Sequence, residues 1–123
     1  MVRYRGLSAL GDLFTHMSVA NHYQQRAQQV AEILKQSHPQ KIVLFGSGAS
    51  GKFTKESDLD ICLVKDGNPL EIKKSLWKLL RNAGYDWEIE PDIHVFSPSQ
   101  FSDYLRRGDP FVEEIAKGKV LYE

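Results

Sequence analysis

The stretch FGSGASGKFTKESDLDICLV, residues 45–64, decides the fold of this 123-residue chain because it contains two competing phosphate signatures. Its first half, residues 46–52, spells G-x-x-x-x-G-K, which is most of a P-loop. Its second half places Asp58 and Asp60 one residue apart at the start of an apolar run. The two halves imply different folds and different chemistry.

The P-loop interpretation fails on the residues that follow the lysine. A P-loop needs a Ser or Thr directly after its lysine and a long helix that begins there. Here Phe53 follows Lys52, and Asp58 opens the next apolar run only six residues after Lys52. A crossover between parallel strands takes a dozen or more residues, so it does not fit in this interval. We therefore prefer the interpretation based on the paired aspartates.

In that interpretation the same glycines form a phosphate-binding turn between two strands. A strand over residues 41–45 leads into Gly46, which lets the backbone approach a ligand, and Ser47, whose hydroxyl can donate to a phosphate oxygen. The next strand opens with Asp58 and Asp60, which share one face because strand side chains alternate. The opposite face is apolar and consists of Leu59, Ile61 and Leu63.

A third carboxylate is expected on an adjacent strand. Asp92 opens the apolar stretch 93–96, while Glu90 and Glu88 share its face by alternation and remain alternatives. Carboxylates held close together repel unless a cation neutralises them, and Mg²⁺ prefers carboxylate oxygens together with substrate phosphates. Asp58, Asp60 and Asp92 therefore predict a two-metal site for phosphoryl or nucleotidyl transfer.

The remaining pattern predicts a single α/β (α+β) domain with a small mixed β-sheet flanked by helices. Residues 17–123 form this domain, and residues 1–16 are expected to be an N-terminal extension, disordered or not native. The expected elements are helices over 18–36, 69–83 and 110–117, a helix capped by Ser97 or Ser99, strands over 41–45, 59–64 and 87–96, and a short closing strand or tail over 119–123. Leu70, Leu76, Leu79 and Leu80 are expected to face the core.

Composition excludes several other classes of protein. Sixteen basic residues balance sixteen acidic ones, so no direct nucleic-acid binding is expected. The single cysteine rules out an internal disulfide, and the four histidines show no metal-ligand spacing. No apolar run is long enough for a membrane span, and no signal peptide is present, so the expected location is cytoplasmic. The sequence leaves open whether the protein forms a homo-oligomer.

The spacing Gly46-Ser47, ten residues, Asp58-x-Asp60 resembles the signature of the DNA polymerase β-like nucleotidyltransferase superfamily. It is most similar to the minimal nucleotidyltransferases (MNT type), whose signature reads roughly G-S-x-A-R-G-x5-S-D-x-D. The matching positions are Gly46, Ser47, Ala49, Gly51, Ser57, Asp58 and Asp60, and the ending over 109–123 is also similar. Ser50 stands where the family has arginine, and Lys52 offers only a point charge in its place.

The resemblance implies a fold, a substrate and residue roles. Gly46 and Ser47 would hold the β and γ phosphates of a nucleoside triphosphate, ATP in the first place. Asp58 and Asp60 would bind two Mg²⁺ ions. Asp92 would help to bind the catalytic metal and take the proton from the acceptor hydroxyl.

The resemblance also implies a partner, because some relatives are antitoxins that pair with a helical HEPN-type toxin. The expected reaction is then transfer of AMP from ATP to a hydroxyl of a partner protein. The alternative is a catalytically weak or inactive binding module that neutralises its partner by contact. The acceptor and the base preference stay open.

Overall fold

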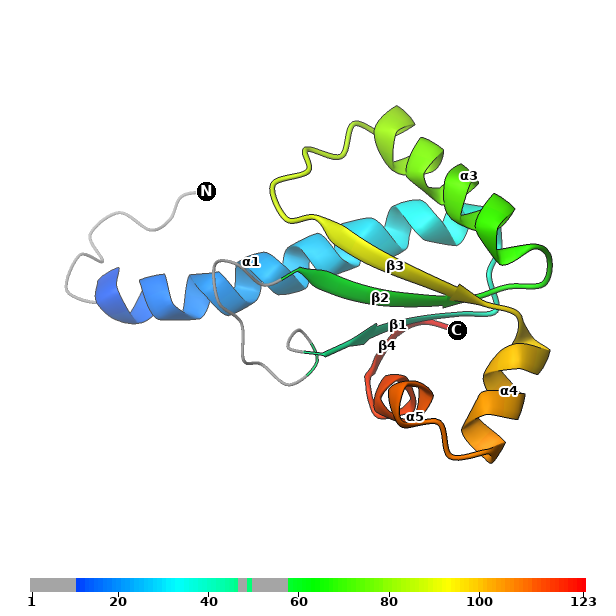
Figure 1. Ribbon diagram of the computed structural model, residues 1–123. Coiled ribbons are helices and arrows are strands. Elements are labelled where there is room, and N and C mark those ends of the chain that lie inside the picture. The colour runs from blue at the N-terminus through cyan, green and yellow to red at the C-terminus, as the bar shows by residue number, and fades with distance from the viewer. Residues whose placement is uncertain (1–10, 47–48, 50–57) are drawn as a thin grey trace.

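The computed structural model of the chain describes residues 11–46, 49 and 58–123, with side chains from residue 21 onward (Figure 1). The elements, in chain order, are α1 (Gly11–Leu34), the short 3₁₀ helix η2 (Lys35–Ser37), β1 (Lys41–Phe45), β2 (Leu59–Val64), α3 (Pro69–Asn82), β3 (Pro91–Phe96), α4 (Pro98–Arg106), α5 (Pro110–Ala116) and β4 (Lys119–Tyr122). Residues 1–10, 47–48 and 50–57 lie outside this description, and so does every prediction made on them, including the role of Ser47.

The four strands form one mixed sheet in the order β3-β2-β1-β4. β1 pairs antiparallel with both β2 and β4, and β2 pairs parallel with β3. The end of β1 and the starts of β2 and β3 therefore meet at one edge of the sheet. The predicted α/β fold with a small mixed sheet is confirmed.

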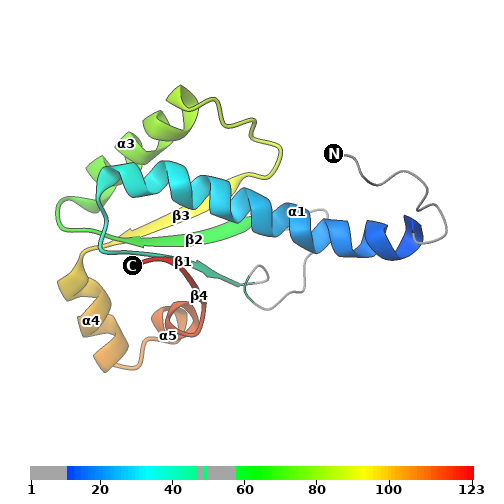
Figure 2. The same ribbon diagram turned by 180° about the vertical axis from the view of Figure 1, so that it is seen from behind.

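Helices cover both faces of the sheet. α1 and α3 lie on one face, and α4 and α5 lie on the other (Figures 1 and 2). The α1/α3 face holds the larger core, which includes Val30, Leu34, Leu44, Ile61, Leu63, Leu76, Leu80 and Ile93. The α4/α5 face holds a smaller core of Val43, Phe45, Cys62, Val64 and Ile115, with Phe96 and Phe101 packed against it. The smaller core does not include the polar residues at the starts of β2 and β3.

Short polar side chains begin the helices, as the sequence predicts. The Asn68 side chain accepts a hydrogen bond from the Glu71 N–H at 3.1 Å, and Pro69 occupies the first turn of α3. Ser97, not Ser99, caps α4. The prediction that Leu70 faces the core is wrong: the residue is 62% exposed, and the apolar face of α3 is instead formed by Ile72, Leu76 and Leu80.

The first helix is longer than the sequence analysis expected. α1 begins at Gly11 instead of Ser18, because no proline separates the two positions and extending an existing helix costs little. It ends at Leu34 and passes into η2. The domain boundary between residues 16 and 17 stays a prediction. Within the described part of the chain, no helix combines the length and apolarity needed to span a membrane.

The segment before β3 is fixed by α1 and not by the sheet. The Arg26 guanidinium on α1 contacts the carboxylates of Asp86 at 2.6 Å and Glu88 at 3.0 Å, and His22 Nε2 lies 2.6 Å from Glu88 Oε1. Trp87 has a positive φ of 61° and stacks on Trp77 of α3. Consequently β3 starts only at Pro91, later than the strand expected over 87–96, and ends at Phe96 as expected.

Candidate functional site

Two of the three predicted carboxylates meet at one edge of the sheet. Asp60 is the second residue of β2, Asp92 is the second residue of β3, and the two are register partners in the parallel pairing. Register partners on adjacent strands carry their side chains on the same face. Leu59 and Ile61 fill the opposite face, as predicted, so the carboxylates lie on the α4/α5 side of the sheet.

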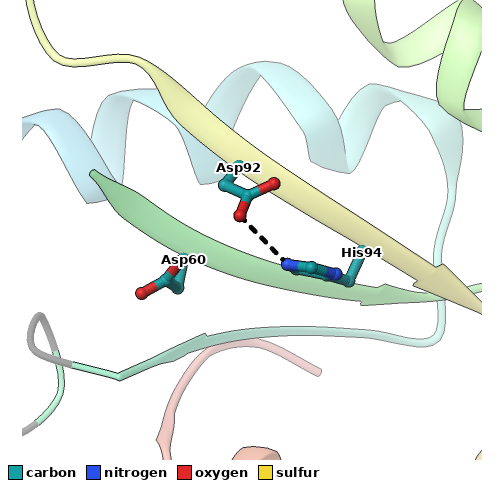
Figure 3. Close-up of side chains that lie close together, drawn as sticks. All are labelled: Asp60, Asp92 and His94. Carbon is teal, nitrogen blue, oxygen red and sulfur yellow. Dashed lines mark ion pairs between the residues drawn. The ribbon is translucent and has the colours of Figure 1, made fainter.

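A histidine that the sequence analysis left without a role joins these carboxylates. His94 lies two residues after Asp92 on β3, and its Nε2 atom is 3.3 Å from Asp92 Oδ2 (Figure 3). One ligand atom from each of Asp60, Asp92 and His94 lies within 4.8 Å of the others. The spacing Asp-x-His on a strand was the available signal, because alternation puts both side chains on one face.

Gly46 places the end of β1 directly against Asp60. Its φ is +68°, in the left-handed region that favours glycine, and its carbonyl accepts a hydrogen bond from the Ala49 N–H at 3.2 Å. A Cβ atom at Gly46 would overlap Asp60 Oδ2 and lie 3.3 Å from Asp60 Cγ. The sequence analysis assigned Gly46 to ligand approach; the structure adds that the residue makes room for the Asp60 carboxylate.

The electrostatics of the site centre on Asp60. Burial raises the pKa of Asp60, and the nearby charges of Asp92 and Asp58 raise it further, while His94 lowers it. Asp92 is more accessible, with 51% of its side chain exposed, and His94 is 31% exposed. The surroundings therefore disfavour the charged form of the half-buried Asp60 carboxylate, and the second carboxylate, Asp92, is presented to solvent.

Two aromatic rings pack against the imidazole ring of His94. The ring centroid of His94 lies 5.6 Å from that of Phe45 on β1 and 5.2 Å from that of Phe111 on α5. Phe45 is buried, whereas Phe111 is 44% exposed. Cys62, the register partner of His94, is fully buried, and burial raises the pKa of its thiol to about 12, so it fills the core and is no nucleophile.

The remaining predicted site residues have different surroundings. Asp58 is exposed, directly precedes β2 and lies outside the Asp60–Asp92–His94 cluster. Ser47 is outside the described residues. Glu90 is exposed and directly precedes β3, and its carbonyl accepts a hydrogen bond from the Leu59 N–H at 3.1 Å. Glu88 is held by α1, so the alternation that made it a substitute for Asp92 does not apply.

The donor set fits a divalent cation. Asp60 and Asp92 supply anionic oxygens, which hard cations prefer. His94 supplies a nitrogen that lies within 4.8 Å of an oxygen of each carboxylate. The pKa of Asp60 is raised by burial first and by the nearby Asp92 carboxylate second, and a bound cation would favour the charged form against both effects. When bound, such a cation can neutralise phosphate oxygens and activate an attacking oxygen.

Comparison with known proteins identifies the family. No curated protein matches the chain. A family model described as a nucleotidyltransferase domain matches residues 27–122, which include all four strands and the site at their edge. This match confirms the resemblance to polymerase β-like nucleotidyltransferases drawn from the Gly-Ser and Asp-x-Asp spacing. The chain therefore belongs to the nucleotidyltransferase domain family, whose activity is nucleotidyl transfer.

Proposed function

We propose that the chain transfers AMP from ATP, with Mg²⁺, to a hydroxyl group of a partner protein in the cytoplasm. The observation that carries this proposal is the register pairing of Asp60 with Asp92 beside the Gly46 turn. Two carboxylates on adjacent strands, next to a glycine whose positive φ is typical of a tight turn, are suited to a metal–triphosphate complex. Family membership supports the nucleotidyl group as the one transferred.

Each predicted residue has a distinct task in this reaction. Gly46 and Ser47 would hold the β and γ phosphates, and Asp58 and Asp60 would hold two Mg²⁺ ions. Asp92 would help to hold the catalytic ion and would accept the proton of the acceptor hydroxyl. The hydroxyl oxygen bonds to the α-phosphorus, the bond from the α-phosphorus to the bridging oxygen breaks, and pyrophosphate leaves. Bound Mg²⁺ supplies neutralisation of the phosphate charge.

The exposure of Asp92 supports an acceptor that arrives from solvent on another protein. Its side chain is 51% exposed, so an acceptor hydroxyl on another protein can reach it. The resemblance to MNT antitoxins favours a small helical protein of the HEPN type as the partner. A second candidate is neutralisation of that partner by contact alone, which Ser50 in place of the family's arginine favours.

The proposed site is tested by measuring the thermal stability of the protein with Mg²⁺, with ATP and with both. The carboxylates need the cation and the cation needs the phosphates, so Mg²⁺ and ATP together should raise Tm more than the sum of the separate shifts. The double change Asp58→Asn with Asp60→Asn should remove this synergy. Asp66→Asn, an exposed aspartate just beyond the other end of β2, is the matched control and should keep it.

The outcome decides where the nucleotide binds. Loss of synergy in the double variant alone supports the site. Full synergy in the double variant, with circular dichroism showing a folded protein, would place the nucleotide elsewhere.

A further inference from the structure

His94 is the one member of the cluster that a site for Mg²⁺ does not need. Its Nε2 atom is 3.3 Å from Asp92 Oδ2, and the ligand atoms of the whole cluster lie within 4.8 Å of one another. Neighbouring ligands on an octahedral ion, each about 2.1 Å from it, lie about 3 Å apart. The spacing of Asp92 and His94 is thus already close to that of two ligands on one ion.

We propose that His94 is a direct ligand of the cation between Asp60 and Asp92, and that it makes this site prefer a transition-metal dication, such as Co²⁺ or Zn²⁺, over Mg²⁺. The proposal deepens the proposed function and rests on it, because it takes Asp60 and Asp92 as metal ligands. It concerns the protein without nucleotide, when no phosphate oxygen completes the coordination.

The reason for the preference is the chemistry of imidazole. Mg²⁺ binds oxygen ligands and keeps several waters, so a nitrogen ligand adds little to its affinity. Zn²⁺ and its neighbours in the first row bind imidazole well and rise in affinity along the series towards copper. Two carboxylates and one imidazole leave coordination positions open, as in catalytic metal sites.

The packing of the ring supports this role. Phe45 and Phe111 contact the imidazole ring, with centroids 5.6 Å and 5.2 Å away, so the ring does not rotate freely. A side chain that is already oriented loses little conformational entropy when it binds a ligand. The same packing leaves the edge with Nε2 directed at Asp92 (Figure 3).

The competing explanation is that His94 only forms an ion pair with Asp92. Such a histidine would neutralise part of the negative charge and would compete with any cation. Its removal would then leave the ratio of transition-metal affinity to Mg²⁺ affinity unchanged. The two explanations differ in this ratio and not in the overall affinity.

The test uses the untagged full chain without nucleotide and measures Co²⁺ and Mg²⁺ affinities by calorimetry. His94→Phe removes the nitrogen and keeps an aromatic ring against Phe45 and Phe111, and His94→Asn is a smaller second variant. The control is His38→Asn, an exposed histidine with a left-handed backbone that asparagine tolerates. The visible absorption of bound Co²⁺ reports nitrogen coordination independently.

Wild type and His38→Asn should bind Co²⁺ more tightly than Mg²⁺. Losing an outer partner of a metal ligand costs about 10–100-fold in affinity, and losing a direct ligand should cost at least about tenfold. Both His94 variants should therefore bind Co²⁺ at least about tenfold more weakly, with an altered Co²⁺ spectrum and Mg²⁺ affinity within about twofold of wild type.

An unchanged Co²⁺-to-Mg²⁺ ratio in folded His94→Phe and His94→Asn would overturn the inference. If Mg²⁺ binding is then still lost in Asp60→Asn, the proposed function stands and only the role of His94 is wrong. Absence of Co²⁺ binding to nucleotide-free wild type would also overturn the inference, whereas the proposed function would be overturned only by the loss of Mg²⁺–ATP synergy in wild type.

Discussion

Asp60 on β2 and Asp92 on β3 are register partners, and burial together with the neighbouring carboxylate raises the pKa of Asp60. Two anionic side chains side by side are unfavourable in the metal-free protein, and His94 offsets only part of this repulsion. Such an arrangement lowers stability and is retained where a site needs it. The stability of the metal-free protein therefore reports on the site.

Asp60→Asn is expected to stabilise the metal-free protein at neutral pH. The folded-state pKa of Asp60 lies above its unfolded value, so between these values the folded chain binds more protons than the unfolded chain. The free energy of unfolding of wild type therefore falls as pH rises through that window. Asparagine does not titrate, so Asp60→Asn does not lose this stability. Urea unfolding in a chelator should show Asp60→Asn above wild type at about pH 7, and the difference should vanish below the ordinary aspartate pKa of about 4.

Asp66→Asn is the control for this comparison and should leave stability almost unchanged at both pH values. Equal stability of wild type and Asp60→Asn at neutral pH would contradict the claim that the Asp60 carboxylate destabilises the metal-free protein.

Gly46→Ala is expected to destabilise the protein through contact with Asp60. A side chain at a positive φ costs about 1–3 kcal/mol, and the new Cβ would also displace the Asp60 carboxylate. The Asp60 Cβ itself lies at an ordinary 3.6 Å, so Asp60→Ala should relieve the overlap. Urea unfolding of both single variants and the double variant should give a favourable coupling of about 0.5–3 kcal/mol.

Strictly additive effects of Gly46→Ala and Asp60→Ala would show that the backbone angle alone makes this position glycine.

Glu88→Gln is expected to make the protein less sensitive to acid. The hydrogen bond from Arg26, followed by that from His22, lowers the pKa of Glu88 below its ordinary value. The stabilisation is therefore complete above the ordinary pKa and is lost as pH falls through the depressed value. The free energy of unfolding, plotted against pH from neutral to acid, should fall less steeply in Glu88→Gln than in wild type. In Glu90→Gln, a change at an exposed glutamate two residues away, it should fall as steeply as in wild type. Equal slopes in Glu88→Gln and wild type would contradict the contact.

The parts of the fold that could be predicted are those written in local sequence. The strands over Lys41–Phe45 and Leu59–Val64 are short apolar runs bounded by polar residues, and the caps at Asn68 and Ser97 need only a few neighbouring residues. The Asp60–Asp92 pair was found because each residue opens an apolar strand.

The parts that were missed depend on contacts between distant segments. His94 belongs to the site only because β2 and β3 pair in this register and Phe45 and Phe111 hold the ring. Glu88 turns to α1 because Arg26 is there. The Asp-x-His spacing places His94 on the same strand face as Asp92, but neither the strand register nor the contact of Glu88 with Arg26 can be read from the local sequence. The role of Ser47 stays a prediction.

Transfer of a label from ATP by wild type and by Asp92→Asn tests the central claim most directly. The protein is incubated with Mg²⁺, ATP labelled at the α-phosphorus, and a small helical protein of the proposed partner class, encoded by a neighbouring gene. We expect label on the partner, a mass gain of one AMP and release of pyrophosphate. Asp92→Asn should bind nucleotide almost normally and transfer about 10²–10⁴-fold more slowly, because a general base contributes about that factor, while Glu90→Gln should transfer normally. Equal labelling by wild type and Asp92→Asn, or tight partner binding with no labelling by wild type, would contradict the account.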